Sequence, residues 1–123
     1  MISRIDHISI AVKDYERALY FFQHVLGAIP GISGKDHTLK YFWQSFSMGD
    51  LSGLELLKPI EEGSFLDNFF KKRRTGGVHH ITLQTPDIHD VKKRLEENHI
   101  PYFGLNVEND LWKELFIHPD DAF

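Results

Sequence analysis

Two histidines carry the strongest chemical signal in this sequence. His7 stands in "IDHISIAVKDY" and His80 in "VHHITLQTPDI", and each is followed by an alternating apolar run and, seven residues later, by an aspartate. A third metal-capable side chain, Glu55, interrupts the apolar stretch "GLELLKP". Two imidazoles and a carboxylate suit a divalent transition metal ion, such as zinc, cobalt, nickel or manganese. We therefore interpret His7, Glu55 and His80 as candidate ligands of one metal ion.

Alternation along the strands predicts that these three side chains share one face of a sheet. Successive side chains of a strand point to opposite faces, so the apolar residues between the candidate ligands take the other face, under a helix. The residues expected on that packed face are Ile8, Ile10, Val12, Leu54, Leu56, Ile81 and Leu83. Glu55 in an apolar strand is costly unless it is paired or bound to metal, which favours the ligand interpretation.

The two histidine segments also begin an internal repeat with an offset of 73 residues. The offset relates His7 to His80 and Asp14 to Asp87, and each copy reads as a strand, a helix and further strands. One copy is too small to bury its sheet alone. We therefore expect one domain over residues 1–123, with a first module at 1–60, a linking helix at 61–77 and a second module at 78–123. Packing by pseudo-twofold symmetry would bring the two histidines to the same axis.

Helix signals follow both strands. Asp14 and Asp87 are expected to cap helices, and Gly27 is expected to end the first of them. Ser64, with Asp67 three residues later, resembles a capping box at the start of the linking helix. The apolar face expected for the first helix consists of Ala18, Phe21, Phe22, Val25 and Leu26.

Composition excludes several classes of function. The formal net charge is -4 with both signs mixed along the chain, which is not the basic surface of a nucleic-acid binder. The chain has no cysteine, so disulfides, thiolate catalysis and cysteine-bound metal are excluded. No apolar run reaches membrane-spanning length and the N-terminus lacks a signal-peptide pattern, so we expect a cytoplasmic protein with no membrane partner.

The remaining histidines have simpler interpretations. A lone histidine at the start of a strand is more often a surface or hydrogen-bonded residue than a ligand, and only the repeat raises His7 and His80 above that expectation. His79 is assigned a structural role on the packed side or the rim. The histidines expected at exposed helix or loop positions are His24, His37, His89 and His99.

The segments "DHISIAVKD", "LELLKP" and "GGVHHITLQTPDI" together resemble the vicinal oxygen chelate superfamily, which includes glyoxalase I, methylmalonyl-CoA epimerase, extradiol dioxygenases and bleomycin-resistance proteins. The stretch "FLDNFFKKRRTGGVHHITLQTPDI" is nearest to the epimerase-like branch. The resemblance implies an α+β fold of two tandem βαβββ modules with pseudo-twofold symmetry, forming a curled mixed sheet around one site, and a homodimer. The family's ligands fall on His7, Glu55 and His80.

A fourth ligand of the family, usually a glutamate, lies on the final strand of the second module, which is absent from this sequence. Either the chain is truncated at Phe123 or the protein works without that residue. We favour truncation, because the loss of a strand would leave an open sheet edge.

The resemblance implies a lyase or isomerase that stabilises the enolate of a chelated carbonyl substrate for proton transfer, of the acyl-CoA epimerase or lactoylglutathione lyase type. The substrate would be a small carbonyl, thioester or hemithioacetal compound. Glu55 would be both metal ligand and catalytic proton carrier. The alternative is a metal-free small-molecule binding protein of the bleomycin-resistance type, and metal content separates the two.

Some features stay open in the sequence. Methylmalonyl-CoA epimerases carry a catalytic glutamate where this chain has "GKDHTLKYF", so Asp36 or His37 would have to substitute for it, unless both are loop residues. The cations at 71–74 could meet a coenzyme A phosphate or simply end a helix in solvent. The aromatic residues that could line a cavity or belong to the core are Tyr41, Phe42, Trp43 and Phe46.

Overall fold

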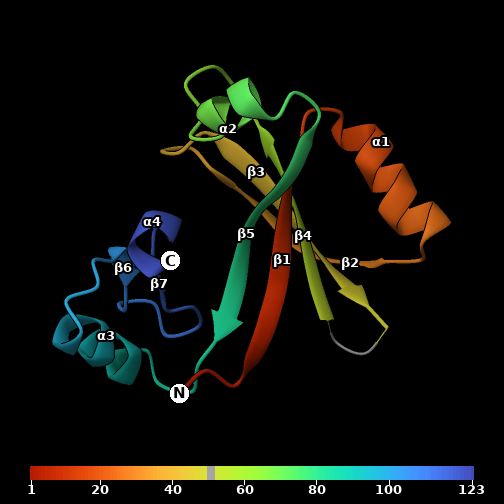
Figure 1. Ribbon diagram of the computed structural model, residues 1–123. Helices are drawn as coiled ribbons and strands as arrows, with labels where there is room; N and C mark the ends of the chain where they lie inside the picture. Colours follow the sequence, from red (N-terminus) through yellow and green to blue (C-terminus); the bar gives the residue numbers. More distant parts are fainter. Residues whose placement is uncertain (50–51) are drawn as a thin grey trace. The chain divides into compact units, whose positions relative to one another are not determined.

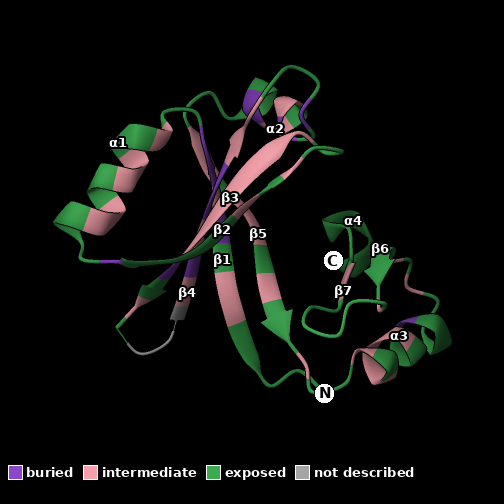
Figure 2. Ribbon diagram, turned by 180° about the vertical axis from the view of Figure 1, so that it is seen from behind, coloured by how far each residue is buried: buried purple, intermediate pink, exposed green. Residues whose placement is uncertain are grey.

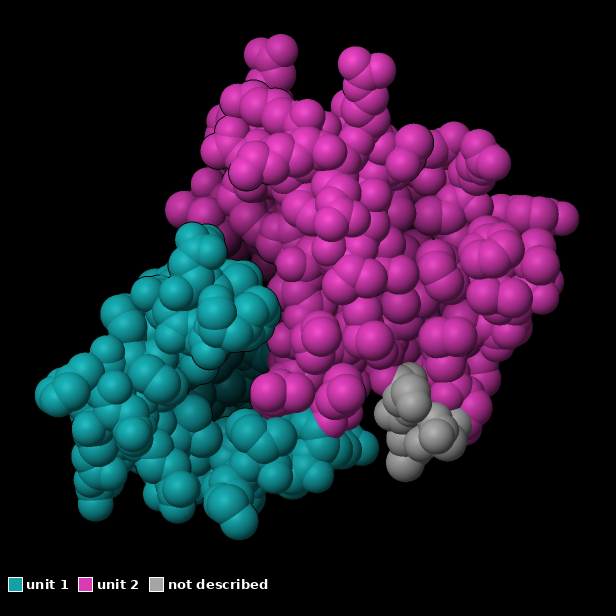
Figure 3. All heavy atoms as spheres, viewed as in Figure 1, with its two compact units in different colours: residues 1–4, 84–123 teal, residues 5–83 magenta. Residues whose placement is uncertain are grey.

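The computed structural model describes residues 1–49 and 52–123 of the chain. They form two compact units, one of residues 5–83 and one of residues 1–4 with 84–123 (Figure 3). Each unit is described by itself below. Within the described residues, none of the helices has the length and apolar character needed to span a membrane.

The larger unit is built on a five-stranded sheet with the strand order β2-β3-β4-β1-β5 (Figure 1). The strands are β1 (Arg4–Val12), β2 (Ile29–Asp36), β3 (Tyr41–Met48), β4 (Ser52–Pro59) and β5 (Gly76–Gln84). β1 pairs with β4 in parallel, whereas β3 pairs with both β2 and β4 in antiparallel fashion. The sheet is mixed and curled and does not close, which confirms the expected α+β class.

Alternation along β4 separates two apolar clusters on the two faces of this sheet. Leu54 and Leu56 belong to the cluster beneath the first helix, whereas Leu57 belongs to the cluster on the opposite face, as the sequence predicted. The first cluster contains Val12, Ala28, Phe46, Leu54 and Leu56. The second contains Ala11, Leu57, Leu66 and Phe70. Figure 2 shows buried residues in purple on the strands of this sheet. Both faces of the central strands are therefore covered by apolar side chains.

The first helix begins as expected but packs differently. Asp14 caps α1 (Tyr15–Leu19) by accepting a hydrogen bond from Arg17 N, and Gly27 ends the helical segment with a φ of 73°. After Leu19 the chain continues as the π-helix η1 (Tyr20–Val25). The side chains that reach the core are Tyr15, Ala18, Leu19 and Phe22. Phe21, Val25 and Leu26 are exposed, contrary to the prediction, because the wider π-turn rotates them away from the 3.6-residue stripe.

Two apolar residues of β5 also depart from the prediction. Ile81 and Leu83 are 58% and 51% exposed, although they were expected beneath a helix. Within the larger unit α1 packs on β4, and the helix that follows β5 in the chain belongs to the smaller unit. Ile8 on β1 is likewise exposed, while Ile10 and Val12 pack as expected.

The linking helix is shorter than the sequence suggested. α2 runs over Asp67–Lys72, three residues after the expected start at Ser64. Ser64 Oγ accepts a hydrogen bond from Leu66 N, and Asp67 Oδ2 accepts one from Gly63 N. The polar pair thus stabilises the turn before the helix, and Leu66 and Phe70 close the apolar cluster on that face.

The smaller unit holds α3 (Ile88–Glu97), a two-stranded antiparallel sheet of β6 (Phe103–Asn106) and β7 (Glu114–Phe116), and the short helix α4 (Pro119–Ala122). Asp87 caps α3 by accepting hydrogen bonds from His89 N and Asp90 N, as predicted.

Candidate metal centre

Three neighbouring strands carry the candidate ligands. His7 lies on β1, Glu55 on β4 and His80 on β5, and these strands are adjacent in the order β4-β1-β5. One ligand atom from each of the three side chains lies within 4.8 Å of the others. The side chains of His7 and Glu55 are 14% and 15% exposed, so the group is shielded but not sealed from solvent.

The register of β1 and β4 explains how His7 reaches this group. Gly53 is the partner of His7 in the parallel pairing, and Glu55 is the partner of Ser9. A Cβ atom at Gly53 would lie 2.7 Å from His7 Cβ and 2.5 Å from Asp6 O. The missing side chain at Gly53 therefore leaves the room in which His7 sits, with its Nε2 atom 3.8 Å from Glu55 Oε1.

Hydrogen bonds orient the His7 ring. Its Nδ1 atom donates to Asp6 Oδ2 at 2.8 Å, because a carboxylate can only accept. Its Nε2 atom lies 3.0 Å from Thr82 Oγ1 on β5. With the proton held on Nδ1 by Asp6, Nε2 accepts a hydrogen bond from the Thr82 hydroxyl, and it is this nitrogen that lies near Glu55.

The His80 ring lies between two partners. Its Nδ1 atom lies 2.9 Å from Nδ1 of His79, and its Nε2 atom lies 2.9 Å from Ser9 Oγ. Burial, followed by the neighbouring His79 and His7, lowers the pKa of His80 to about 4. His80 is therefore a neutral imidazole at neutral pH. Burial also lowers the pKa of His79.

Ser9 joins the ligands and was not predicted from the sequence. It is fully buried, and its hydroxyl donates to Glu55 Oε1 at 2.7 Å while lying against His80. The alternation that placed His7 on this face also placed Ser9 there. Ser9 could therefore have been predicted as a neighbour of the ligands from its position two residues after His7. Asp6 and His79 were missed because a residue next to a ligand along a strand is expected to face the other way.

Other candidate residues fall outside this group. Asp36 Oδ1 accepts hydrogen bonds from Thr38 N and Leu39 N, so this carboxylate caps a turn, and His37 is exposed. His24, His89 and His99 are exposed, as expected. The cations at 71–74 are exposed as well.

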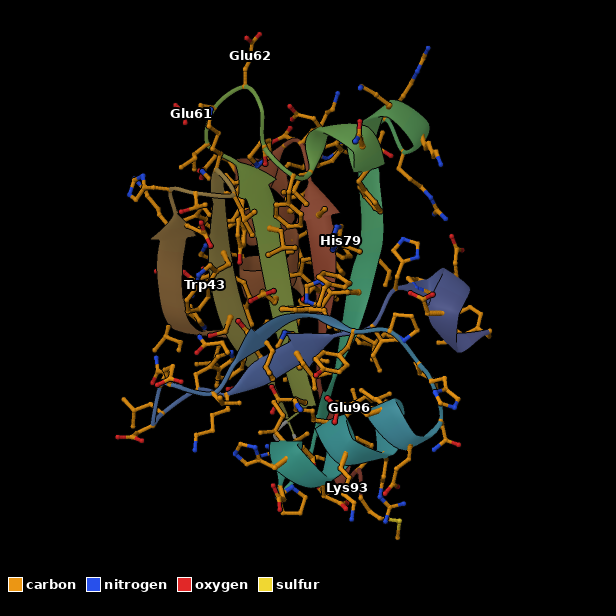
Figure 4. The ribbon with its side chains drawn as sticks, turned by 90° about the vertical axis from the view of Figure 1, so that its left-hand side faces the viewer. Trp43, Glu61, Glu62, His79, Lys93 and Glu96 are labelled. Carbon is orange, nitrogen blue, oxygen red and sulfur yellow. The ribbon has the colours of Figure 1, made fainter. Side chains whose placement is uncertain are left out.

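The four aromatic residues of β3 divide between the two faces of the sheet. Tyr41 and Trp43 pack on the apolar cluster that shares a face with Glu55. Trp43 covers Gly34, where an added Cβ would lie 2.9 Å from the indole ring, and Figure 4 labels Trp43 and His79 on their strands. Phe46 is buried beneath α1, and Phe42 contacts the Tyr15 ring. Only Tyr41 and Trp43 are therefore on the ligand-bearing face.

Residues 6–114 match the family described as the Glyoxalase/Bleomycin resistance protein/Dioxygenase superfamily. The chain belongs to this superfamily. A relative named ethylmalonyl-CoA/methylmalonyl-CoA epimerase, from Cereibacter sphaeroides, is 33% identical over 98% of this chain and 92% of its own length. The human mitochondrial methylmalonyl-CoA epimerase is 30% identical over 98% of this chain and 69% of its own length. The resemblance to the epimerase-like branch is thereby confirmed.

Solved structures of this superfamily share the fold. The methylmalonyl-CoA epimerase of Mycobacterium tuberculosis aligns with a TM-score of 0.86 at 22% identity, over 98% of this chain and 82% of that chain. A Streptomyces coelicolor methylmalonyl-CoA epimerase variant, in complex with 2-nitronate-propionyl-CoA, aligns with a TM-score of 0.85 at 23% identity, over 99% and 91% of the two chains.

The donor set fits the divalent metal ion that the superfamily implies. Two imidazoles and a carboxylate converge from one face, and the depressed pKa of His80 keeps its ring neutral. Two donor atoms that both bind one ion at about 2.1 Å can lie at most about 4.2 Å apart. The widest separation within the group is 4.8 Å, so a small closing movement of the side chains would suffice.

Proposed function

We propose that this protein is an acyl-CoA epimerase, which moves the proton on the carbon next to the thioester carbonyl of a 2-branched acyl-CoA such as methylmalonyl-CoA. The observation that carries the proposal is the convergence of His7, Glu55 and His80 within 4.8 Å on one face of the sheet. The relatives at about 30% identity, all named as epimerases of such thioesters, support the substrate class. A metal-free binding module would have no need of this donor set.

His7, Glu55 and His80 would hold the ion. A divalent ion bound there acts as a Lewis acid toward carbonyl oxygens, which acidifies the neighbouring C–H bond. His80 offers a neutral imidazole without prior loss of a proton, because its pKa lies at about 4. Asp6 keeps the His7 proton on Nδ1, which directs Nε2 toward the shared centre.

Glu55 is the carboxylate placed to accept the substrate proton. Its side chain is only 15% exposed, and Ser9 donates a hydrogen bond to one of its oxygens. That hydrogen bond helps to hold the carboxylate in position beside the two imidazoles. General base catalysis by a positioned carboxylate contributes about 10²–10⁴-fold to such a step.

The proposal is tested by metal analysis and hydrogen exchange. The protein is purified with zinc or cobalt, its metal content is measured, and deuterium exchange is followed by NMR on a 2-methyl acyl-CoA and on a glutathione hemithioacetal. We expect one metal ion per chain and exchange only on the thioester. Exchange only on the hemithioacetal would instead indicate the lactoylglutathione lyase type.

Matched variants locate the activity. His80→Ala should lose both the bound metal and the deuterium exchange on the substrate. Its circular dichroism should stay unchanged, because the His80 side chain is not part of either apolar cluster. His89→Ala, at an exposed histidine of α3, should retain both. A wild-type protein that holds no metal yet binds an aromatic ligand tightly would replace the enzyme with the binding-module alternative.

We also propose that the protein works as a homodimer, as the family resemblance implies. The exposure of Ile81 and Leu83 on β5 is consistent with a further covering partner. Light scattering at high micromolar concentration should give twice the mass of the chain, and a monomer under those conditions would contradict the proposal.

A further inference from the structure

Asp6 and His79 stand in equivalent places in the two copies of the repeat. Each immediately precedes a candidate ligand, and the offset between them is the same 73 residues that relates His7 to His80. Asp6 Oδ2 lies 2.8 Å from Nδ1 of His7, and His79 Nδ1 lies 2.9 Å from Nδ1 of His80. In both copies the preceding side chain therefore contacts the same nitrogen of the ligand imidazole.

The other nitrogens are matched in the same way. Ser9 on β1 contacts Nε2 of His80, and Thr82 on β5 contacts Nε2 of His7, at 2.9 Å and 3.0 Å. Ser9 and Thr82 are again 73 residues apart. Each strand thus supplies one partner to its own histidine at Nδ1 and one to the histidine of the other strand at Nε2.

From this correspondence we propose that His79 is a positioning residue, which fixes the nitrogen through which His80 binds the metal. The inference rests on the proposed metal site. Histidine ligands are generally oriented by a hydrogen bond to the ring nitrogen that does not bind the metal. Asp6 provides that bond to His7, and His79 provides it to His80 with an imidazole in place of a carboxylate.

The hydrogen-bond pattern defines two states of the pair. Ser9 has one proton and donates it to Glu55, so it accepts from Nε2–H of His80, whose Nδ1 then accepts from Nδ1–H of His79. Binding of an ion through Nε2 requires the proton of His80 to move to Nδ1. The proton of His79 then moves to its own Nε2, and the hydrogen bond between the rings reverses. Both rings stay neutral in both states, and no proton is gained or lost by the pair.

Aromatic side chains hold His79 in the position this role requires. Its ring centroid lies 5.2 Å from the Phe65 ring and 5.2 Å from the Phe69 ring. The His79 and His80 rings are nearly perpendicular, at 83°, with centroids 5.2 Å apart. The packing limits rotation of the His79 ring, so its Nδ1 atom stays directed at His80.

Three substitutions separate hydrogen bonding from packing. His79→Phe keeps an aromatic ring against Phe65 and Phe69 but removes the polar atom, whereas His79→Asn places an amide near the position of Nδ1. Phe69→Leu is the control for packing, since leucine keeps an apolar side chain beside the His79 ring, which Phe65 also contacts. Cobalt affinity is measured by competition with a chelator, and the d–d spectrum reports the ligand set. Circular dichroism with thermal unfolding of the metal-free proteins verifies folding.

The expected result is that His79→Phe binds cobalt about 10–100-fold more weakly than the wild type, as for other orienting partners of metal ligands. His79→Asn and Phe69→Leu should keep most of the affinity and the wild-type spectrum. Cobalt binding of His79→Phe equal to that of the wild type, or an equal loss in His79→Asn, would overturn the inference.

An NMR measurement tests the same inference without relying on metal affinity. Long-range ¹H–¹⁵N spectra of the metal-free wild type should show His80 as a single Nε2–H tautomer, which changes to Nδ1–H when zinc is added. Metal-free His79→Phe should keep the Nε2–H tautomer, because Ser9 still accepts that proton, but the ¹⁵N shift of His80 Nδ1 should move to that of a nitrogen that has lost its hydrogen bond. If the wild type binds no metal but this shift difference is present, the proposed metal function fails while the positioning of His80 by His79 stands. An unchanged Nδ1 shift in His79→Phe would contradict the positioning role.

Discussion

The Ser9 hydroxyl donates a 2.7 Å hydrogen bond to the carboxylate of Glu55, its direct partner in the parallel pairing of β1 with β4. Ser9 is fully buried and also contacts His80, so one hydroxyl links two of the three candidate ligands. A buried carboxylate that lost this donor would be left with fewer hydrogen bonds in a shielded site. Ser9 is therefore expected to affect both the stability of the protein and the geometry of the site.

Ser9→Ala should lower the free energy of unfolding of the metal-free protein by about 1–3 kcal/mol, because the partly buried Glu55 carboxylate loses one hydrogen-bond donor and His80 loses a contact. Urea unfolding followed by circular dichroism measures this change. Ser47→Ala, at an exposed serine of β3, is the control and should stay within about 0.5 kcal/mol of the wild type. Equal stability of the two variants would show that the hydroxyl of Ser9 contributes nothing to the site.

Gly53→Ala should disturb the site through His7. The added Cβ would lie 2.7 Å from His7 Cβ and 2.5 Å from Asp6 O, so β1 has to shift away from β4. We expect a loss of about 1–3 kcal/mol in stability and a clear loss of metal affinity. Gly27→Ala places a residue at a φ of 73° with no atom within 4 Å of its Cβ. It should reduce stability but not metal affinity, and a parallel loss of affinity in both variants would refute the steric explanation.

Glu55→Gln separates the two roles proposed for Glu55. The amide oxygen can still bind a metal ion, but the amide cannot accept a proton from the substrate. Metal content should be largely retained, while the rate of deuterium exchange on the thioester should fall by about 10²–10⁴-fold. Exchange at the wild-type rate would assign Glu55 the role of ligand alone and place the proton acceptor elsewhere.

The stability of the metal-free protein should depend on pH through His80. Because the pKa of His80 is about 4 in the folded protein, below its ordinary value of 6.5, the unfolded chain binds a proton between these values that the folded chain does not. Stability should therefore fall as the pH drops from about 6.5 toward about 4, and this contribution should be constant above 6.5. The free energy of unfolding is measured across this range with a chelator present.

Matched histidine variants isolate that contribution. His80→Gln should reduce the pH dependence between about 4 and 6.5, since one of the two histidines with a lowered pKa is gone. His89→Gln, at an exposed position, should keep the wild-type slope. An unchanged slope in His80→Gln would mean that other groups cause the acid destabilisation.

Local patterns in the sequence predicted the parts of the fold that depend on short-range rules. Alternation along "IDHISIAVKDY" predicted a strand, which the structure has as β1, and the aspartates at 14 and 87 marked both helix starts. The same alternation put His7 and Glu55 on the face opposite Leu54 and Leu56. These predictions succeeded because strand parity and helix capping depend on residues close together in the chain.

The exposed residues of the first helix and of β5 could not be predicted in this way. The π-helix over Tyr20–Val25 changes the period on which the apolar stripe was counted, so Val25 and Leu26 leave the core. Strand parity alone put Ile81 and Leu83 on a packed face, but α1 packs on β4 and the helix that follows β5 belongs to the smaller unit. Both outcomes follow from packing between elements distant in sequence.

The sequence by itself determined which donor atoms this protein offers and which face of each strand they occupy, since residue type and strand parity are local properties. Only the tertiary structure decided how those donors are held. The contacts of Ser9 with Glu55 and of His79 with His80 depend on strand register and on side-chain rotation. A shift of one residue in the β1–β4 pairing would place Ser9 opposite Leu54 or Leu56 and break its hydrogen bond to Glu55. No local pattern encodes that register.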